Sequence, residues 1–199
     1  MKIKILSVVM AAALVLLAGC QSGSSVPRAP SSAPEPPTSE QADENLKQFV
    51  TLLSDSWVLA DSWNKADDIR ADAFPAFYYR AALLPKNPNG WSTAMQVPAD
   101  EFEEEIAKYF DVSTEHLRTV KNYDAAANCY SFEYGIGSGA KLDVNSVAVN
   151  GAVTTVSFTQ YDLGENPTQD GEVQLKESGD SYKVLSCSVN AVVKPDFDF

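Results

Sequence analysis

The chain has 199 residues, of which 45% are hydrophobic and 10% aromatic, which is enough to build one ordinary domain with a buried core. This composition excludes a collagen-like repeat, a disulfide-dense miniprotein and a wholly disordered chain. Fifteen Lys and Arg residues against 27 Asp and Glu residues give a net charge of −12. So acidic a chain argues against nucleic acid as a partner, because phosphate binding needs clustered basic side chains.

The first twenty residues predict export. Lys2 and Lys4 are followed by an apolar stretch, residues 5–18, that only Ser7 interrupts. This stretch is shorter than the ~18–20 apolar residues that span a bilayer, and it has the length of the apolar region of a signal peptide. It runs into Leu17-Ala18-Gly19-Cys20, which resembles the lipobox of bacterial lipoproteins.

The lipobox resemblance implies that the chain is cut before Cys20 and that the Cys20 thiol carries a diacylglyceryl group. Two acyl chains give durable membrane attachment where one does not. We therefore expect a signal peptide at residues 1–19 and a lipid anchor on the extracytoplasmic face of the cell membrane. An ordinary secretory signal that happens to contain a cysteine is the alternative.

Residues 20–44 form a Pro- and Ser-rich segment without aromatic residues. Such a segment buries too little apolar surface to fold, and it is typical of an extended tether. Loss of residues 1–19 removes two lysines and leaves 13 basic and 27 acidic residues, a net charge of −14. Because an anionic lipid surface repels such a domain, we expect residues 45–199 to be held away from the membrane.

The first half of the domain has helical periodicity. Apolar residues recur at three- and four-residue spacing from residue 45 to about 68, which predicts one long helix. Pro75 is placed as the first residue of a second helix, which ends near Pro85. Residues 98–110 predict a third helix, with acidic residues in its first turns, and residues 113–118 predict a short helical piece.

The second half alternates with the period of strands. Residues 128–134 predict one strand, and residues 147–161 predict a hairpin with a type I′ turn at Asn150-Gly151. Residues 172–189 predict a second hairpin around Ser178-Gly179-Asp180. The fold class is therefore predicted to be α+β, with N-terminal helices packed on a curved antiparallel sheet built from consecutive hairpins.

This order of elements over about residues 45–190 resembles the cone-shaped α+β domains of the nuclear-transport-factor-2-like and cystatin-like proteins, and the small uncharacterised lipoproteins of clostridia. The resemblance implies a domain type that serves isomerases, dehydratases and many non-catalytic binding modules. We expect a binding or interaction module for an unknown protein or small-molecule ligand. The alternative is a small cone-fold enzyme, isomerase- or hydrolase-like, that uses a carboxylate and His116 in an internal cavity.

Candidate site residues are few. A ligand pocket at the open end of a cone is predicted from aromatic and polar residues in the helical half, namely Tyr78, Tyr79, Arg80, Trp91, His116 and Tyr123. Cys129 and Cys187 lie in predicted strands and either form a disulfide or stay separate buried thiols. No catalytic residue, metal ligand or cofactor is assigned, since one His and two remaining Cys do not fill a zinc site.

Four further motifs match chemistry only in part. Residues 135–140 match a dinucleotide-binding glycine pattern without the helix that it needs, and Ser62-Trp63-Asn64-Lys65 matches S-x-x-K without its partner motifs. Oxygen ligands for calcium cluster in one loop at Asp162, Glu165, Asn166 and Asp170. The run Glu101, Glu103, Glu104 and Glu105 is interpreted as a solvated helix face.

Overall fold

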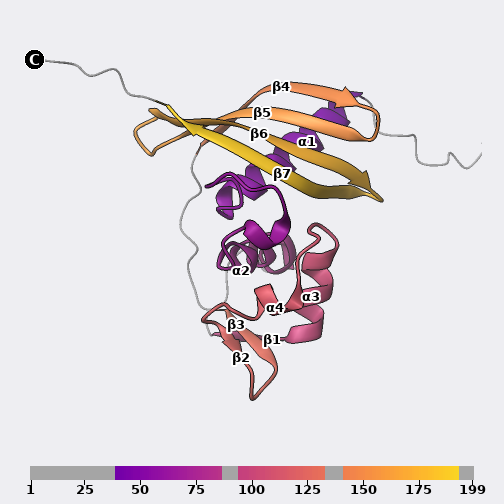
Figure 1. The fold of residues 1–199 in the computed structure, drawn as a ribbon, viewed down its shortest axis with the longest axis vertical. Helices are drawn as coiled ribbons and strands as arrows, with labels where there is room; N and C mark the ends of the chain where they lie inside the picture. The colour runs from indigo at the N-terminus through magenta and orange to yellow at the C-terminus, as the bar shows by residue number, and fades with distance from the viewer. Residues whose placement is uncertain (1–38, 87–93, 133–140, 193–199) are drawn as a thin grey trace, which may run out of the picture. The chain divides into compact units, whose positions relative to one another are not determined.

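The computed structural model describes residues 39–86, 94–132 and 141–192, with side chains from residue 44 onward. All described elements belong to one unit, residues 37–199, so a chain that begins at Gln21 retains every one of them. The helices are α1 (Ser39–Asp55), α2 (Ala73–Tyr78), α3 (Ala99–Ala107) and α4 (Thr114–Leu117), with short turns η1 (Ala66–Asp68), η2 (Tyr79–Leu83) and η3 (Leu84–Lys86). The strands are β1 (Met95–Pro98), β2 (Tyr123–Asp124), β3 (Cys129–Phe132), β4 (Leu142–Asn150), β5 (Val153–Tyr161), β6 (Pro167–Ser178) and β7 (Ser181–Ala191) (Figure 1).

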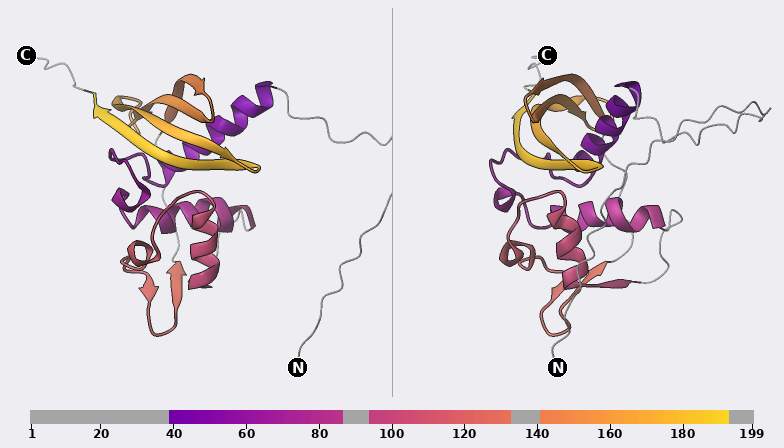
Figure 2. Two further views of the ribbon diagram at one scale, coloured as in Figure 1. Left: turned by 45° about the vertical axis from the view of Figure 1, so that its right-hand side comes forward. Right: turned by 90° about the vertical axis from the view of Figure 1, so that its right-hand side faces the viewer.

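The predicted α+β class is confirmed. The last four strands form an antiparallel meander in the order β4-β5-β6-β7, and α1 runs along the concave side of this curved sheet (Figure 2). Buried and half-buried residues alternate along β5, so that Val156 and Phe158 face the core together with Leu53 of α1. A hydrogen bond of 2.7 Å from Gln160 Nε2 to Ser54 Oγ ties the end of α1 to β5.

Both predicted hairpins form, but the first turn differs in type. Asn150 pairs with Val153, so the two loop residues are Gly151 and Ala152. Only Gly151 has a positive φ, 61°, which is the pattern of a type II′ turn, whereas a type I′ turn needs positive φ at both central residues. Gly179 repeats the arrangement in the β6–β7 turn, with φ 62°.

The predicted first helix is too long at its C-terminus. The helix α1 ends at Asp55 rather than near residue 68, because Trp57 adopts a left-handed φ of 61°. The following chain is extended, and Trp63 pairs with Cys187 on the outer edge of β7 through two backbone hydrogen bonds of 2.8 and 3.0 Å. The segment after α1 therefore covers one edge of the large sheet instead of continuing a helix.

The strand predicted at residues 128–134 belongs to a second, small sheet rather than to the meander. This sheet has the order β1-β3-β2, and its strands β1 and β2 were not predicted. The helix α3 packs on it, with the ring centroids of Phe102 and Tyr130 only 4.0 Å apart. Phe102 and Ile106 of α3, and Phe110 three residues after its end, are all buried.

The two sheets share one hydrophobic core. Phe49 of α1 stacks on Tyr109 after α3 and also lies against Tyr182 of β7, with centroid distances of 6.0 and 5.4 Å. A backbone hydrogen bond of 2.8 Å from the Val184 N–H to the Tyr109 carbonyl joins the same regions. Over the described ranges, every helix is too short or too polar to cross a membrane.

Candidate functional site

The residues of the predicted pocket do not converge on one cavity. Tyr78 is fully buried and its hydroxyl donates to Glu101 Oε1 at 3.2 Å, whereas Tyr79 is only partly buried against the core. Burial and the nearby Glu101 carboxylate raise the pKa of Tyr78. Arg80 forms an ion pair with Asp55 at 3.6 Å and lines a groove between α1 and η2. Burial raises the pKa of the Asp55 carboxyl, and the Arg80 charge opposes that rise.

His116 and Tyr123 lie in two further places. The His116 ring nitrogen Nε2 contacts the carbonyl oxygen of Ile69 at 2.8 Å, and the ring packs edge-on against Phe74. Tyr123 lies on β2 and lines a groove of its own. Trp91 lies outside the described residues.

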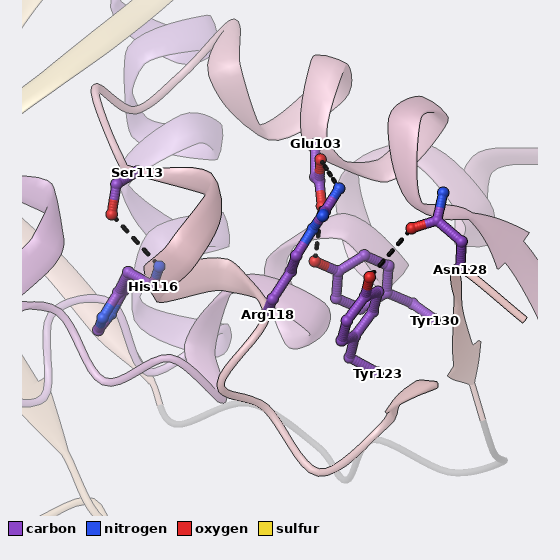
Figure 3. Close-up of polar contacts among 7 residues, drawn as sticks. All are labelled: Glu103, Ser113, His116, Arg118, Tyr123, Asn128 and Tyr130. Atoms are coloured by element: carbon purple, nitrogen blue, oxygen red, sulfur yellow. Dashed lines mark hydrogen bonds and ion pairs between the residues drawn. The ribbon is translucent and has the colours of Figure 1, made fainter. Parts of the chain in front are cut away.

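A charged network lies between α3, α4 and the small sheet. Arg118, the residue after α4, donates to both carboxylate oxygens of Glu103, from Nε to Oε1 at 2.7 Å and from Nη2 to Oε2 at 3.0 Å (Figure 3). The Tyr130 hydroxyl donates to Glu103 Oε1 at 3.1 Å. Glu103 therefore accepts three hydrogen bonds while its side chain is only 14% exposed. A bidentate, charge-assisted pair of this kind fixes both side chains in one geometry.

Tyr123 completes the network. The Arg118 guanidinium lies 5.4 Å from the centroid of the Tyr123 ring, within cation–π range. The Tyr123 ring packs against Tyr130 at 5.0 Å, and its hydroxyl donates to Asn128 Oδ1 at 3.0 Å (Figure 3). Burial and the Glu103 carboxylate raise the pKa of Tyr130, and the hydrogen bond to Glu103 raises the pKa of Arg118. Both groups therefore keep their protons at neutral pH.

A groove of about 450 Å³ adjoins this network, a volume within the range of small-molecule sites. It is lined by polar residues of β2, β3 and the turn before them, namely Lys121, Asn122, Tyr123, Asp124 and Ser131. Asn122 and Ser131 form two hydrogen bonds with each other. Asn122 Nδ2 donates to the Ser131 carbonyl at 3.0 Å, and the Ser131 N–H donates to the Asn122 carbonyl at 2.8 Å. The backbone of the groove is thus held in place before any ligand binds.

Ser113, His116 and Asp67 lie near one another, but not in the order of a catalytic triad. Ser113 Oγ donates to Asp67 Oδ1 at 2.7 Å. It accepts from the backbone N–H of His116, not from the His116 ring (Figure 3). The imidazole contacts Ile69 instead. A serine nucleophile requires the ring nitrogen of the histidine as its base. Ser113 is therefore the N-cap of α4, and Asp67 holds that cap.

Cys129 and Cys187 are both buried free thiols, on β3 of the small sheet and β7 of the large one. The sequence left a disulfide between them open, and in this structure both thiols are free. Burial raises the pKa of the Cys187 thiol to about 12, which makes it unreactive at neutral pH.

The acidic loop suggested for calcium is organised by hydrogen bonds of its own. Asp162 Oδ1 accepts from the backbone N–H groups of Gly164 and Asn166, both at 2.9 Å, and Asp170 Oδ1 accepts from Thr159 at 2.6 Å. In the described part of the chain, no three His, Cys, Asp or Glu side chains come together as a metal site.

Of the other partial motifs, the glycine pattern at residues 135–140 lies outside the described residues. Ser62 falls within the long helix predicted from residue 45 to about 68, but it lies after the end of α1. Its hydroxyl donates to the Val189 carbonyl at 3.2 Å and accepts from the Val189 N–H at 2.8 Å. The hydroxyl is therefore used to dock the chain onto β7, which explains its presence without chemistry.

The glutamate run is solvated as expected at Glu101 and Glu104, which are exposed, whereas Glu103 and Glu105 are partly buried. Glu101 and Glu103 face Tyr78 and Tyr130, the two buried tyrosines. A sequence signal existed for Glu103, because it follows Ala99 by four residues and precedes Ile106 by three, and both of these are buried. Glu103 thus lies at the border of the buried stripe of α3.

Comparison with known proteins gives one family. Residues 62–146 match a family of unknown function (DUF6070), a stretch that is less than half of the chain. The matched stretch contains Glu103, Arg118, Tyr123 and Tyr130 and every residue named for the adjoining groove. No curated protein and no solved structure matches the chain.

Proposed function

We propose that this protein is a lipid-anchored extracytoplasmic lipoprotein whose folded domain is a binding module. The observation that carries the binding role is the groove at Lys121–Asp124 and Ser131, built against the rigid Glu103–Arg118–Tyr123–Tyr130 network. The anchor is supported by Leu17-Ala18-Gly19-Cys20 after a short apolar stretch. The one long helix crossed by a curved four-stranded sheet supports the cone-like or cystatin-like resemblance.

The lining of the groove favours a polar ligand. Lys121 supplies a cation, Asn122 and Ser131 supply hydrogen-bonding groups, and Tyr123 supplies an aromatic edge. Sites that fix a small molecule usually combine an aromatic surface with a few placed polar groups of this kind. Because the Glu103–Arg118 pair already orients Tyr123, the ligand meets a preformed surface, which lowers the entropy cost of binding.

The geometry does not favour the alternative of an enzyme that uses His116. General base catalysis needs a ring nitrogen within reach of the substrate proton. Here His116 Nε2 is bonded to the Ile69 carbonyl and the ring packs on Phe74. Glu103, the carboxylate of the network, is neutralised by Arg118.

Binding at the groove is tested by nuclear magnetic resonance on residues 21–199 with a library of polar fragments. We expect bound fragments to shift the backbone amides of residues 121–124 and 131. Lys121→Ala should weaken these fragments several-fold, while Lys176→Ala, on an exposed position of β6, leaves them unchanged. Fragments that gather elsewhere, or that bind the Lys121→Ala variant equally well, would refute the groove as the binding site.

The anchor is tested separately by cell fractionation. Cys20→Ser is expected to release the protein from the membrane fraction or to leave it uncleaved at the larger mass. Cys129→Ser makes the same chemical change at a cysteine of the folded domain and is expected to leave both location and mass unchanged. If Cys20→Ser behaves like Cys129→Ser, the lipoprotein assignment fails.

A further inference from the structure

The large sheet has one covered edge and one open edge. The β7 edge is covered by Trp63, which pairs with Cys187, and by Tyr109, which accepts a backbone hydrogen bond from Val184. At the opposite edge, β4 pairs only with β5 within the described ranges (Figure 1). Its outward backbone groups are therefore a template for another strand.

The open edge is uncharged from Val144 to its end at Asn150. Residues 144–161 contain no Lys, Arg, Asp or Glu, in a chain whose net charge is −12. Val147 and Val149 on β4 are 43% and 71% exposed, and they are two of the four large hydrophobic side chains exposed in the described part of the chain. Natural sheets usually protect an open edge with charged residues or proline, and on β4 only Asp143, near the start of the strand, is charged.

The register of the β4–β5 hairpin shows which backbone groups point outward. Asn150 and Val153 flank a two-residue turn, so they form a hydrogen-bonded pair. Hydrogen-bonded and non-hydrogen-bonded pairs alternate in an antiparallel ladder. Val149 with Thr154 and Val147 with Val156 are then non-hydrogen-bonded pairs, and the N–H and C=O groups of Val147 and Val149 face away from β5.

We propose that β4 pairs with β4 of a second copy of this chain, antiparallel, about a two-fold axis at Ala148. In this register Val147 lies opposite Val149 of the second copy and Val149 opposite Val147 of the second copy. All the outward backbone groups of these two residues are then used in two hydrogen-bonded pairs, and two meanders become one continuous sheet. A two-fold interface of this kind needs a surface that is complementary to itself.

The match of apolar side chains favours a second copy as the occupant, because the exposed Val147 and Val149 lie opposite each other across the two-fold axis. The uncharged 144–161 hairpin also lets two acidic chains approach without placing like charges side by side. If the two-fold axis moved by one residue, to Val149 or to Val147, the hydrogen-bonded pairs would include the turn residue Gly151 or Asn145, which lies at an irregularity of the β4–β5 register. Either shift would lose one of the regular hydrogen-bonded pairs. The pairing is independent of the groove and of the lipid anchor.

The dimer is tested by sedimentation equilibrium on residues 21–199. We expect a concentration-dependent dimer that Val149→Lys weakens at least tenfold, because a buried edge does not accept an ammonium group. Gln174→Lys adds the same charge at an exposed position of β6 and is expected to keep the dimer. Both variants make the chain less negative, so loss of the dimer in only one of them cannot arise from general charge repulsion. Circular dichroism checks that both variants are folded.

The register is tested by disulfide cross-linking. Ala148 faces its copy in a non-hydrogen-bonded pair, where Cα atoms are ~4.5 Å apart, within the range that a disulfide bridges. Ala148→Cys should give a covalent dimer on mild oxidation, whereas Thr155→Cys, its cross-strand neighbour on β5, should not. A chain that stays monomeric at millimolar concentration, a dimer that survives Val149→Lys, or equal cross-linking by both cysteines would overturn the proposal.

Discussion

Trp57 adopts a backbone conformation that usually belongs to glycine. Its φ is 61°, its N–H bonds to the Ser54 carbonyl at 3.0 Å, and the N–H of Val58 bonds to the Leu53 carbonyl at 3.0 Å. These two bonds are the Schellman motif that ends many helices, with tryptophan in the left-handed position. The left-handed conformation costs an ordinary residue about 1–2 kcal/mol. Local sequence preference therefore did not predict the end of α1.

The strain at Trp57 is tested by comparing two replacements at that position. Trp57→Gly and Trp57→Ala remove the same half-exposed ring, so they differ mainly in backbone freedom. We expect the glycine variant to be more stable than the alanine variant by about 0.5–1 kcal/mol, since relief of the left-handed strain exceeds the extra entropy of the unfolded glycine chain. Urea denaturation measures the difference. An alanine variant as stable as the glycine variant would show that φ at this position is not strained.

Asp67 connects η1 to the start of α4 through a charged hydrogen-bond acceptor. Its Oδ1 accepts from the backbone N–H of Ser113 at 2.9 Å and from the Ser113 hydroxyl at 2.7 Å. These two bonds lower the pKa of Asp67. A lowered folded-state pKa means that the ionised carboxylate stabilises the protein above the unfolded-state pKa of about 3.9 and that this stability is lost as the pH falls through the folded-state pKa.

Asp67→Asn keeps the shape of the acceptor and removes its charge. We expect a loss of about 1 kcal/mol in the free energy of unfolding at pH 7, the difference between a charged and a neutral hydrogen bond. This difference from the wild type should shrink as the pH falls below about 4. Asp68→Asn is the control, because that carboxylate makes only a long contact of 3.8 Å with Lys65. A pH-independent deficit in Asp67→Asn would contradict the account.

Among the elements, those with strong periodicity were predictable. The buried positions Phe102, Ile106 and Phe110 recur at four-residue spacing, and α3 forms within the predicted range, 98–110. The two hairpins of the large sheet were predictable for the same reason, since β5 alternates along its whole length. Each of these elements buries one face, and a buried face gives apolar residues that recur with the period of the helix or strand.

The short strands were not predictable. The strand β1 has four residues and β2 has two, Tyr123 and Asp124, too few to show an alternation. Their place is set by pairing with β3, which for β1 is a contact between residues far apart in the chain and for β2 a short local hairpin. The groove and the Glu103–Arg118 pair depend on this small sheet, so the sequence indicated Tyr123 as a pocket residue but not its neighbours.

Gly171 in β6 is required by close packing rather than by its backbone conformation. A Cβ atom there would lie 2.6 Å from Phe158 Cζ, 2.8 Å from the Ser188 carbonyl oxygen and 2.8 Å from Val189 Cγ1. Such overlap in a packed sheet costs about 1–3 kcal/mol.

We expect Gly171→Ala to lower the free energy of unfolding by about 2 kcal/mol. In a Phe158→Leu background the aromatic ring that causes the shortest contact is gone, so the same substitution should cost about 1 kcal/mol less. Denaturant titration of the four proteins in this cycle measures the coupling. Equal cost in both backgrounds would mean that Phe158 is not what excludes a side chain at Gly171.

At the scale of the whole molecule, charge and the N-terminal segment support one arrangement. A chain that begins at Cys20 has 13 basic and 27 acidic residues, so an anionic membrane repels its domain. The 20–44 segment contains five of the chain's eleven prolines, which favours an extended tether. In the account proposed here, the lipid holds the protein at the membrane while the tether keeps its groove and its open β4 edge accessible.

The mass of the mature N-terminal peptide tests the central claim most directly. The protein is isolated from membranes of cells grown with labelled palmitate, digested, and its N-terminal peptide is identified by mass spectrometry. The account predicts a peptide that begins at Cys20 and carries a diacylglyceryl group with the label. A mature peptide that begins elsewhere, or one that begins at Cys20 with an unmodified thiol, would contradict it.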